Sequence, residues 1–312
     1  MPPRIAITVG DPRGIGPEIV GKILQDPPDG PEYLVIGPEQ LISHLPFEHI
    51  YVGECAARLG LHEAHGPVPS LHFEGPAKEA GIVTALQIEK AVSLALNDSV
   101  QAIVTGPAEK RALDLAGYHY PGHTEWLGEL AGGVETAMML VAGNLRVVLV
   151  TTHIPLHDVP ASISTELVVR KGCMTRTALR DWWRIEEPRL AVCALNPHGG
   201  EGGLFGREDN EILEPAAREL NAAGPLPADT VFVRALRGEF DAVLTPYHDV
   251  GMTAVKVAGF GKGVNVTLGL PFVRTAPDHG TALDIAGKGI ADAGSMREAV
   301  AAAARFASVR AR

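Results

Sequence analysis

The fold is decided by the stretch Arg146-Val-Val-Leu-Val-Thr-Thr-His153, an apolar run typical of a buried strand that ends in a histidine. The same pattern returns in Leu190-Ala-Val-Cys-Ala-Leu-Asn-Pro-His198 and in Asp241-Ala-Val-Leu-Thr-Pro-Tyr-His248. Near-continuous apolarity predicts strands that are covered on both faces, as in parallel or mixed sheets. Ligands of open α/β sheets bind just beyond the carboxyl ends of the strands, so we expect the three histidines at a ligand-binding edge.

Similar short runs alternate with longer helical patterns through the rest of the chain, which predicts a layered α/β/α architecture. The other expected strands are Ile5–Val9, Tyr33–Ile36, Ala102–Thr105 and Val264–Leu268. The expected helices are Gly16–Leu24, Lys78–Asn97, Thr124–Ala131, Thr165–Trp183, Asn210–Asn221 and Ser295–Val309. A length of 312 residues allows two such domains. We expect the first to comprise residues 1–120 plus about 290–312, and the second, residues 121–289, to carry most of the ligand-binding motifs.

Composition and charge narrow the classes of partner. The formal net charge is −10 and no basic block occurs, which argues against a nucleic-acid partner. No apolar run approaches the roughly 20 residues that span a bilayer, and Arg4–Val9 resembles a strand rather than a signal peptide. Cys55, Cys173 and Cys193 follow no disulfide or metal spacing. We therefore expect a cytoplasmic protein with reduced thiols.

The three histidines at strand ends suggest a metal site. Three neutral imidazoles can hold a divalent ion and leave one coordination position for a substrate. A single histidine in this place is usually structural, but that explanation would have to hold three times. The spacings of 45 and 50 residues mean that the fold, not local sequence, would have to assemble the site. By ligand softness, imidazoles suit Zn²⁺, Co²⁺ or Ni²⁺.

Further polar motifs each allow a structural and a functional interpretation. Gly122-His123-Thr124-Glu125 could cap a helix or bind an anion at its N-terminus. The glycine-rich stretch from Asn196 to Asp209 could be a mobile surface loop, or a loop whose backbone approaches a cofactor or substrate. The motif Gly10–Glu18 carries ordinary helix-start signals, with Pro17 and Glu18 in the first turn.

The last two motifs lie toward the C-terminus. The run from His248 to Arg274 contains Lys256, whose charge could serve a phosphate or carboxylate or could simply be solvated. The segment Pro277–Ala282 could cap the following helix or face a cofactor.

At these motifs the chain resembles the 4-hydroxythreonine-4-phosphate dehydrogenase family. The matching segments run in family order over nearly the whole chain: Gly-Asp-Pro-Arg-Gly-Ile-Gly-Pro-Glu, Thr-Gly-Pro-Ala-Glu-Lys110, Gly-His-Thr-Glu, Thr-Thr-His-Ile-Pro, Asn-Pro-His-Gly-Gly-Glu-Gly-Gly, Gly-Pro-Leu-Pro-Ala-Asp-Thr230, Tyr-His-Asp, Asn-Val-Thr-Leu-Gly-Leu-Pro-Phe-Val-Arg and Asp-His-Gly-Thr-Ala-Leu-Asp. The resemblance implies a two-domain α/β/α fold similar to isocitrate and isopropylmalate dehydrogenases, with the active site in the interdomain cleft. It also implies a homodimer with active sites shared between subunits, a divalent metal (Zn²⁺ ahead of Co²⁺ or Mg²⁺), and NAD or NADP.

The resemblance also assigns expected roles to individual residues. The metal ligands would be His153, His198 and His248. The substrate would contact His123, Thr124, Lys256, Asn265 and Arg274. The cofactor would contact Glu201, Gly203, Asp229 and Asp278, and Asp249 would orient a histidine or move a proton.

The implied reaction is oxidation of the C3 hydroxyl of 4-phosphooxy-L-threonine by NAD(P), with the metal lowering the pKa of the alcohol. The β-keto acid then loses CO₂ to give 3-amino-2-oxopropyl phosphate, a precursor of pyridoxal phosphate. The family's His-Asp-Gln-Gly is His-Asp-Val250-Gly in this chain, an expected proline is Thr253, and the usual Asn before Lys110 is Glu109. These departures leave the metal ligands in place and bear on the substrate.

Several alternatives stay open. Paralogues of this family act on 4-phospho-D-threonate or 4-phospho-D-erythronate in sugar-acid catabolism, and a more distant branch acts on a cyclic dihydrodiol dicarboxylate. Lys256, Asn265 and Arg274 favour a phosphorylated acyclic substrate. Two other classes are a non-catalytic binding protein that keeps the fold, and a metallohydrolase.

Overall fold

The computed structural model describes residues 2–51, 76–259 and 261–310, which form two compact units. Unit 1 comprises Met1–Val134 and Leu270–Arg312, and unit 2 comprises Glu135–Gly269. Cys55 lies outside the described residues, whereas Cys173 and Cys193 are free thiols. Within these ranges no helix is both long and apolar enough to cross a bilayer.

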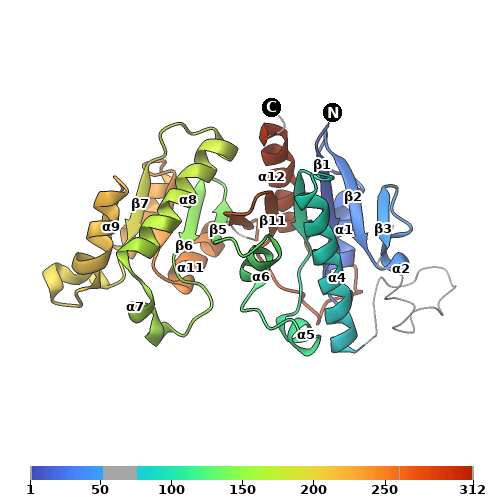
Figure 1. Cartoon of the computed structure of the whole chain (residues 1–312), viewed down its shortest axis with the longest axis horizontal. Coiled ribbons are helices and arrows are strands. Elements are labelled where there is room, and N and C mark those ends of the chain that lie inside the picture. Colours follow the sequence, from blue (N-terminus) through green and yellow to red (C-terminus); the bar gives the residue numbers. More distant parts are fainter. Residues whose placement is uncertain (1, 52–75, 260, 311–312) are drawn as a thin grey trace. The chain divides into compact units, whose positions relative to one another are not determined.

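In the part of unit 1 that the structure describes, five parallel strands lie in the order β3-β2-β1-β4-β11. Their bounds are β1 Arg4–Thr8, β2 Glu32–Gly37, β3 Glu48–Tyr51, β4 Ala102–Thr105 and β11 Val273–Pro277. The helices are α1 Gly16–Leu24, α2 Glu39–Ile42, α4 Ala77–Leu96, α5 Lys110–Leu115, α6 His123–Leu130 and α12 Gly294–Arg310. The two ends of the chain thus lie in the same unit (Figure 1).

Successive side chains along these strands point to opposite faces of the sheet, and helices cover both faces. Ala6 pairs with Ile103, and both side chains join a core cluster with Ile88 of α4. On the opposite face, α12 packs on β11, β4 and β1. Every residue of β4 is buried, as expected for a central strand covered on both faces.

Unit 2 carries six strands in the order β10-β5-β6-β9-β7-β8. The bounds are β5 Ala137–Ala142, β6 Leu145–Leu149, β7 Leu190–Cys193, β8 Ala223–Leu226, β9 Ala242–Thr245 and β10 Val264–Leu268. The hairpin β5–β6 and the pair β5–β10 are antiparallel, and β6, β9, β7 and β8 run parallel. The sheet is therefore mixed.

The helices of unit 2 cover both faces of its sheet. They are η1 Leu156–Asp158, α7 Val159–Ser162, α8 Thr165–Trp183, η2 Pro197–Gly203, η3 Asp209–Leu213, α9 Glu214–Glu219, α10 Ala228–Leu236 and α11 His248–Gly259. Val231 of α10 and Val255 of α11 pack with Val147 and Val243 on one face. Leu179 of α8 packs with Leu190 on the other.

The unit boundaries fall at Val134/Glu135 and at Gly269/Leu270, whereas the sequence led us to expect them after residue 120 and near residue 290. Two contacts account for the difference. Trp126 of α6 packs into the same cluster as Ile88 of α4, which keeps α6 in unit 1. Val273 of β11 pairs with Ala102 of β4, which returns the chain to unit 1 before residue 290.

Candidate functional site

The three histidines follow the carboxyl ends of neighbouring parallel strands of unit 2. His153 follows β6, His248 begins α11 directly after β9, and His198 lies in η2 after β7. The rings of His153 and His248 have centroids 5.8 Å apart. Two imidazoles on one tetrahedral zinc, with Zn–N near 2.0–2.1 Å, have centroids roughly 5 Å apart. The separation of the two rings is thus somewhat larger than that expected for two ligands of one ion.

The third histidine does not join that pair. Among residues 2–51, 76–259 and 261–310, no group of three His, Cys, Asp or Glu side chains is placed to hold a metal. His198 is exposed and sits in the left-handed region at φ 54°. One chain thus brings two of the three expected ligands together.

Asp249 lies within hydrogen-bond distance of one of the paired histidines. Its Oδ1 lies 2.8 Å from Nδ1 of His248, while the carboxylate stays largely exposed. A hydrogen bond to one ring nitrogen fixes the tautomer and directs the other nitrogen outward, the usual support for a metal-ligating histidine. This geometry favours an orienting role for Asp249.

The glycine-rich loop around His198 has an unusual backbone that is anchored at its base. All five residues from His198 to Gly202 have positive φ, including Glu201 at 45°. Non-glycine residues adopt this region at a cost, and such positions concentrate at functional sites. The fully buried Asp209 accepts hydrogen bonds from the backbone N–H groups of Leu195 and Asn196, at 2.8 and 3.0 Å. Asp209 therefore anchors the base of the loop, and sequence reasoning missed this role of Asp209.

A cavity of about 440 Å³ opens beside this loop at the carboxyl ends of β7, β8 and β9. Its lining is Ala194, Leu195, Asn196, Pro197, His198, Pro227, Ala228, Asp229, Tyr247 and Val250. Asp229, in the first turn of α10, carries the only carboxylate of this lining, and no Lys or Arg takes part. Burial raises the pKa of the Cys193 thiol, at the end of β7, to about 12. Gly203 and the exposed Glu201 belong to the same loop.

Of the expected substrate contacts in unit 2, Lys256 lies exposed on α11 and Asn265 lies on β10. The Oδ1 atom of Asn265 is buried without a hydrogen-bond partner. A buried acceptor without a partner costs free energy, which a ligand that donates a hydrogen bond would recover.

In unit 1, His123 and Thr124 are the first residues of α6, and Gly122 rather than either of them is the N-cap. Arg274 lies on β11 and is 1% exposed, with its guanidinium against Thr105 at the end of β4. Burial lowers the pKa of Arg274 to about 10, so it remains protonated at neutral pH.

The expected cofactor residue Asp278 exchanges hydrogen bonds with Ser295 of α12, which gives it a role in tethering that helix.

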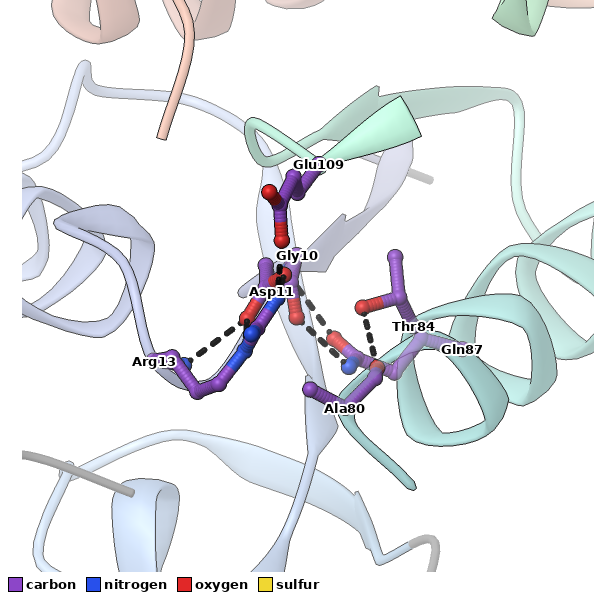
Figure 2. Close-up of polar contacts among 7 residues, drawn as sticks. All are labelled: Gly10, Asp11, Arg13, Ala80, Thr84, Gln87 and Glu109. Atoms are coloured by element: carbon purple, nitrogen blue, oxygen red, sulfur yellow. Dashed lines mark hydrogen bonds and ion pairs between the residues drawn. The ribbon is translucent and has the colours of Figure 1, made fainter. Parts of the chain in front are cut away.

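The loop after β1 is fixed by a polar network that Figure 2 shows. The carboxylate of Asp11 is fully buried and accepts from Nε and Nη2 of Arg13, at 3.1 and 2.7 Å. Nη2 of Arg13 also pairs with Glu109, which follows β4. Gln87 of α4 receives a hydrogen bond from the Gly10 N–H and donates to its carbonyl, at 3.1 and 2.9 Å. The network therefore joins the loops after two adjacent strands.

Replacing Arg13 by Met is expected to destabilise the fold by about 3 kcal/mol, because the change leaves the buried Asp11 carboxylate without its cation. Glu109→Gln should cost less than about 1 kcal/mol, since Glu109 is more exposed and Arg13 keeps Asp11. Chemical denaturation of both variants beside the wild type measures the two values. Equal losses would contradict the dominance of the Arg13–Asp11 contact.

A second cavity of about 570 Å³ lies near the start of β7 and β8, away from the histidines. It is lined by Arg176, Arg180, Glu187, Pro188, Arg189, Leu190, Asn221, Ala223, Glu239 and Phe240. Arg189 is paired with Asp241, which lowers the pKa of that carboxyl, and Glu239 is paired with Arg234. The other two arginines of the lining, Arg176 and Arg180, donate to the backbone carbonyls of Leu220 and Glu186. Since this cavity contains none of the residues expected from the sequence motifs, the histidine edge remains the stronger candidate site.

Comparison with known proteins identifies the family of the chain. Residues 43–303 match the family model described as pyridoxal phosphate biosynthetic protein PdxA. A 4-hydroxythreonine-4-phosphate dehydrogenase from Caulobacter vibrioides is 43% identical over 98% of each chain. A D-threonate 4-phosphate dehydrogenase from Cupriavidus necator is 44% identical over 99% of this chain and 98% of the relative.

Solved structures agree as well. A 4-hydroxythreonine-4-phosphate dehydrogenase from Klebsiella pneumoniae is similar at a TM-score of 0.83 and 34% identity, over 98% of both chains. For the fold alone, a β-decarboxylating dehydrogenase from Thermococcus kodakarensis is similar at a TM-score of 0.51 and 16% identity, over 99% of this chain and 83% of that one. The expected α/β fold class is confirmed.

Proposed function

The chain belongs to the PdxA family of pyridoxal phosphate biosynthetic proteins and is a dehydrogenase, and from this premise we propose that it oxidises 4-phosphooxy-L-threonine at C3 with NAD(P). We propose further that the keto acid so formed loses CO₂ to give 3-amino-2-oxopropyl phosphate. The observation that supports a metal-assisted alcohol oxidation most directly is the His153–His248 pair at the strand ends, with Asp249 bonded to His248.

The residues of the histidine pair suit a divalent ion of the Zn²⁺ type, because imidazole nitrogen is a ligand such ions prefer. We propose that His153, His198 and His248 hold it, with the three shared between two copies of the chain in a homodimer. Once bound, the ion supplies Lewis acidity that favours loss of the proton from the substrate hydroxyl. Asp249 keeps the His248 ring in the required tautomer.

The cavity beside the glycine-rich loop suits one nucleoside half of a dinucleotide, since its volume of about 440 Å³ lies in the usual range for ligand pockets. The bound nicotinamide would supply the hydride acceptor. Asp229 can accept a hydrogen bond from a ribose hydroxyl and would repel a 2′-phosphate, so we propose a preference for NAD over NADP. The open backbone at Gly202, where an added side chain would meet nothing within 4 Å, leaves room for the ligand.

Substrate orientation would come from the remaining polar residues. Arg274 on β11 and Lys256 on α11 each carry a positive charge that suits a phosphate or carboxylate group. The unpartnered Oδ1 of Asn265 can accept a hydrogen bond from a substrate amino or hydroxyl group. Holding these groups fixed keeps the C3–H bond directed at the acceptor.

A second candidate substrate is 4-phospho-D-threonate, because a relative of that name is as similar as those named for the threonine derivative. Val250 lines the cavity beside the glycine-rich loop, where the family usually has Gln, so a donor and an acceptor are replaced by an apolar side chain at the proposed cofactor site.

The experiment that tests the proposal follows NADH formation at 340 nm by the metal-loaded protein. The substrates are 4-phosphooxy-L-threonine, 4-phospho-D-threonate and 4-phospho-D-erythronate, each with NAD and with NADP. We expect turnover of the threonine derivative with NAD at a kcat/KM at least about tenfold above that of the aldonates, a difference of about 1.4 kcal/mol. A reversed order would assign the chain to sugar-acid oxidation, and no turnover of any substrate would favour a binding protein.

A further inference from the structure

We infer that Thr105 is a positioning residue for the substrate, acting through Arg274. The inference rests on the proposed function, in which Arg274 receives an anionic group of the substrate. Thr105 is the last residue of β4, in the Thr-Gly-Pro segment, and no role for it follows from the sequence motifs.

The register of two parallel strands places these side chains together. Arg274 of β11 pairs with Ile103 of β4, so Thr105 lies two residues further along and its side chain points to the same face of the sheet. Nε and Nη2 of Arg274 both donate to Oγ1 of Thr105, at 3.2 and 2.7 Å. Both residues are 1% exposed, so water does not compete for these hydrogen bonds.

The chemistry of the pair suits an anion receptor. A hydroxyl is uncharged, so two bonds from one edge of the guanidinium fix its plane without neutralising its positive charge. Taking a guanidinium out of water is costly, and a phosphate or carboxylate recovers that cost through charge-assisted hydrogen bonds. A threonine in this place therefore orients the cation and still leaves it attractive to an anion, which an Asp or Glu would not do.

Thr105 is itself held by tightly packed backbone. The next residue, Gly106, donates its N–H to both the carbonyl and the hydroxyl of Thr8 on β1, at 3.0 and 3.1 Å. A Cβ at Gly106 would lie 2.5 Å from the carbonyl carbon of Val9, so the two strand ends approach as closely as glycine allows. The hydroxyl that orients Arg274 thus stands on a rigid part of unit 1, as a preorganised binding group requires.

The test compares Thr105→Val and Thr105→Ala, which remove the hydroxyl, with Thr105→Ser, which keeps it. Thr275→Val is the matched control, because Thr275 is a buried threonine next to Arg274 whose hydroxyl bonds instead to Ala299 of α12, at 2.8 Å. We expect the Val and Ala variants to raise KM for the phosphorylated substrate about tenfold or more, the range for a hydrogen bond to a charged group, with kcat within about threefold of wild type. Thr105→Ser should stay within about threefold on both, and Thr275→Val should change thermal stability without changing KM.

Calorimetric titration of the same proteins with inorganic phosphate, in the absence of cofactor, separates this inference from the proposed function. Weaker phosphate binding in Thr105→Val and Thr105→Ala, restored in Thr105→Ser, supports the inference even if no substrate is turned over. The inference would be overturned if all variants bound phosphate equally or if the wild type bound none. It would also be overturned if Thr275→Val raised KM together with its loss of thermal stability.

Discussion

Replacing His248 by Ala is expected to lower turnover of the phosphorylated substrate about 1,000-fold and to abolish stoichiometric binding of the divalent metal. His248 has two features of a metal ligand: its ring lies 5.8 Å from that of His153, and Asp249 bonds to its Nδ1 at 2.8 Å. Loss of an outer-shell partner typically costs roughly 10–100-fold, so loss of a ligand itself should cost more. Steady-state kinetics and metal analysis of the dialysed protein measure the two effects independently.

Two further variants give a smaller expected loss and a control for this test. Asp249→Asn should lose about 10–100-fold, since it removes the orienting charge but leaves the ligand. His119→Ala is the control, because His119 is an exposed histidine whose Nδ1 lies 2.7 Å from Asp114 in a region with no expected role. A His248→Ala protein that keeps both its metal and its turnover would refute the metal-site hypothesis.

The elements predicted best from sequence are those whose pattern is fixed by burial. Helices Gly16–Leu24 and Thr165–Trp183 and strands Ala102–Thr105 and Val264–Leu268 have the bounds expected for them. Each has an apolar stripe or a continuous apolar run between clear breakers. The α/β class follows from this alternation.

The elements that sequence reasoning missed lack such a pattern. β11, Val273–Pro277, contains Arg274 and ends in a proline, so nothing in its composition predicts a fully buried strand. α11 begins at His248, which the apolar pattern places at the end of a strand motif and not at the start of a helix. The expected helix Asn210–Asn221 instead begins with a π-helical turn at Asp209 and ends at Glu219, since Asp209 is held against the backbone of Leu195 and Asn196.

The candidate site shows the same division. A histidine at the end of each apolar run is visible in the sequence, and the fold does place two of the three side by side. The residues that hydrogen-bond to the glycine-rich loop and to Arg274 could not be identified from the sequence pattern. Asp209 lies 11 residues beyond His198, so its contact with the base of the loop depends on how the loop closes. Thr105 and Arg274 lie on different strands, so their contact depends on the register of those strands, which only the folded chain reveals.

Mixing two inactive histidine variants is expected to restore about a quarter of the wild-type activity if the metal site is shared between copies. One chain pairs His153 with His248, while the described residues contain no group of three ligands, so we propose that His198 comes from the other copy. In a mixed dimer of His153→Ala and His198→Ala, one site carries both changes and the other carries neither. With random mixing, half of the dimers are mixed and half of their sites are intact.

The three possible mixtures distinguish this arrangement from its rivals. His153→Ala with His198→Ala, and His248→Ala with His198→Ala, should both regain activity after the subunits are dissociated and reassembled together. His153→Ala with His248→Ala should not, because those two rings lie together in one chain and every site then carries one change. No recovery in any mixture, while wild-type protein treated in the same way recovers fully, would mean that each chain assembles its own site. His198 would then have to move to reach the His153–His248 pair, and metal binding would be coupled to a rearrangement of the glycine-rich loop.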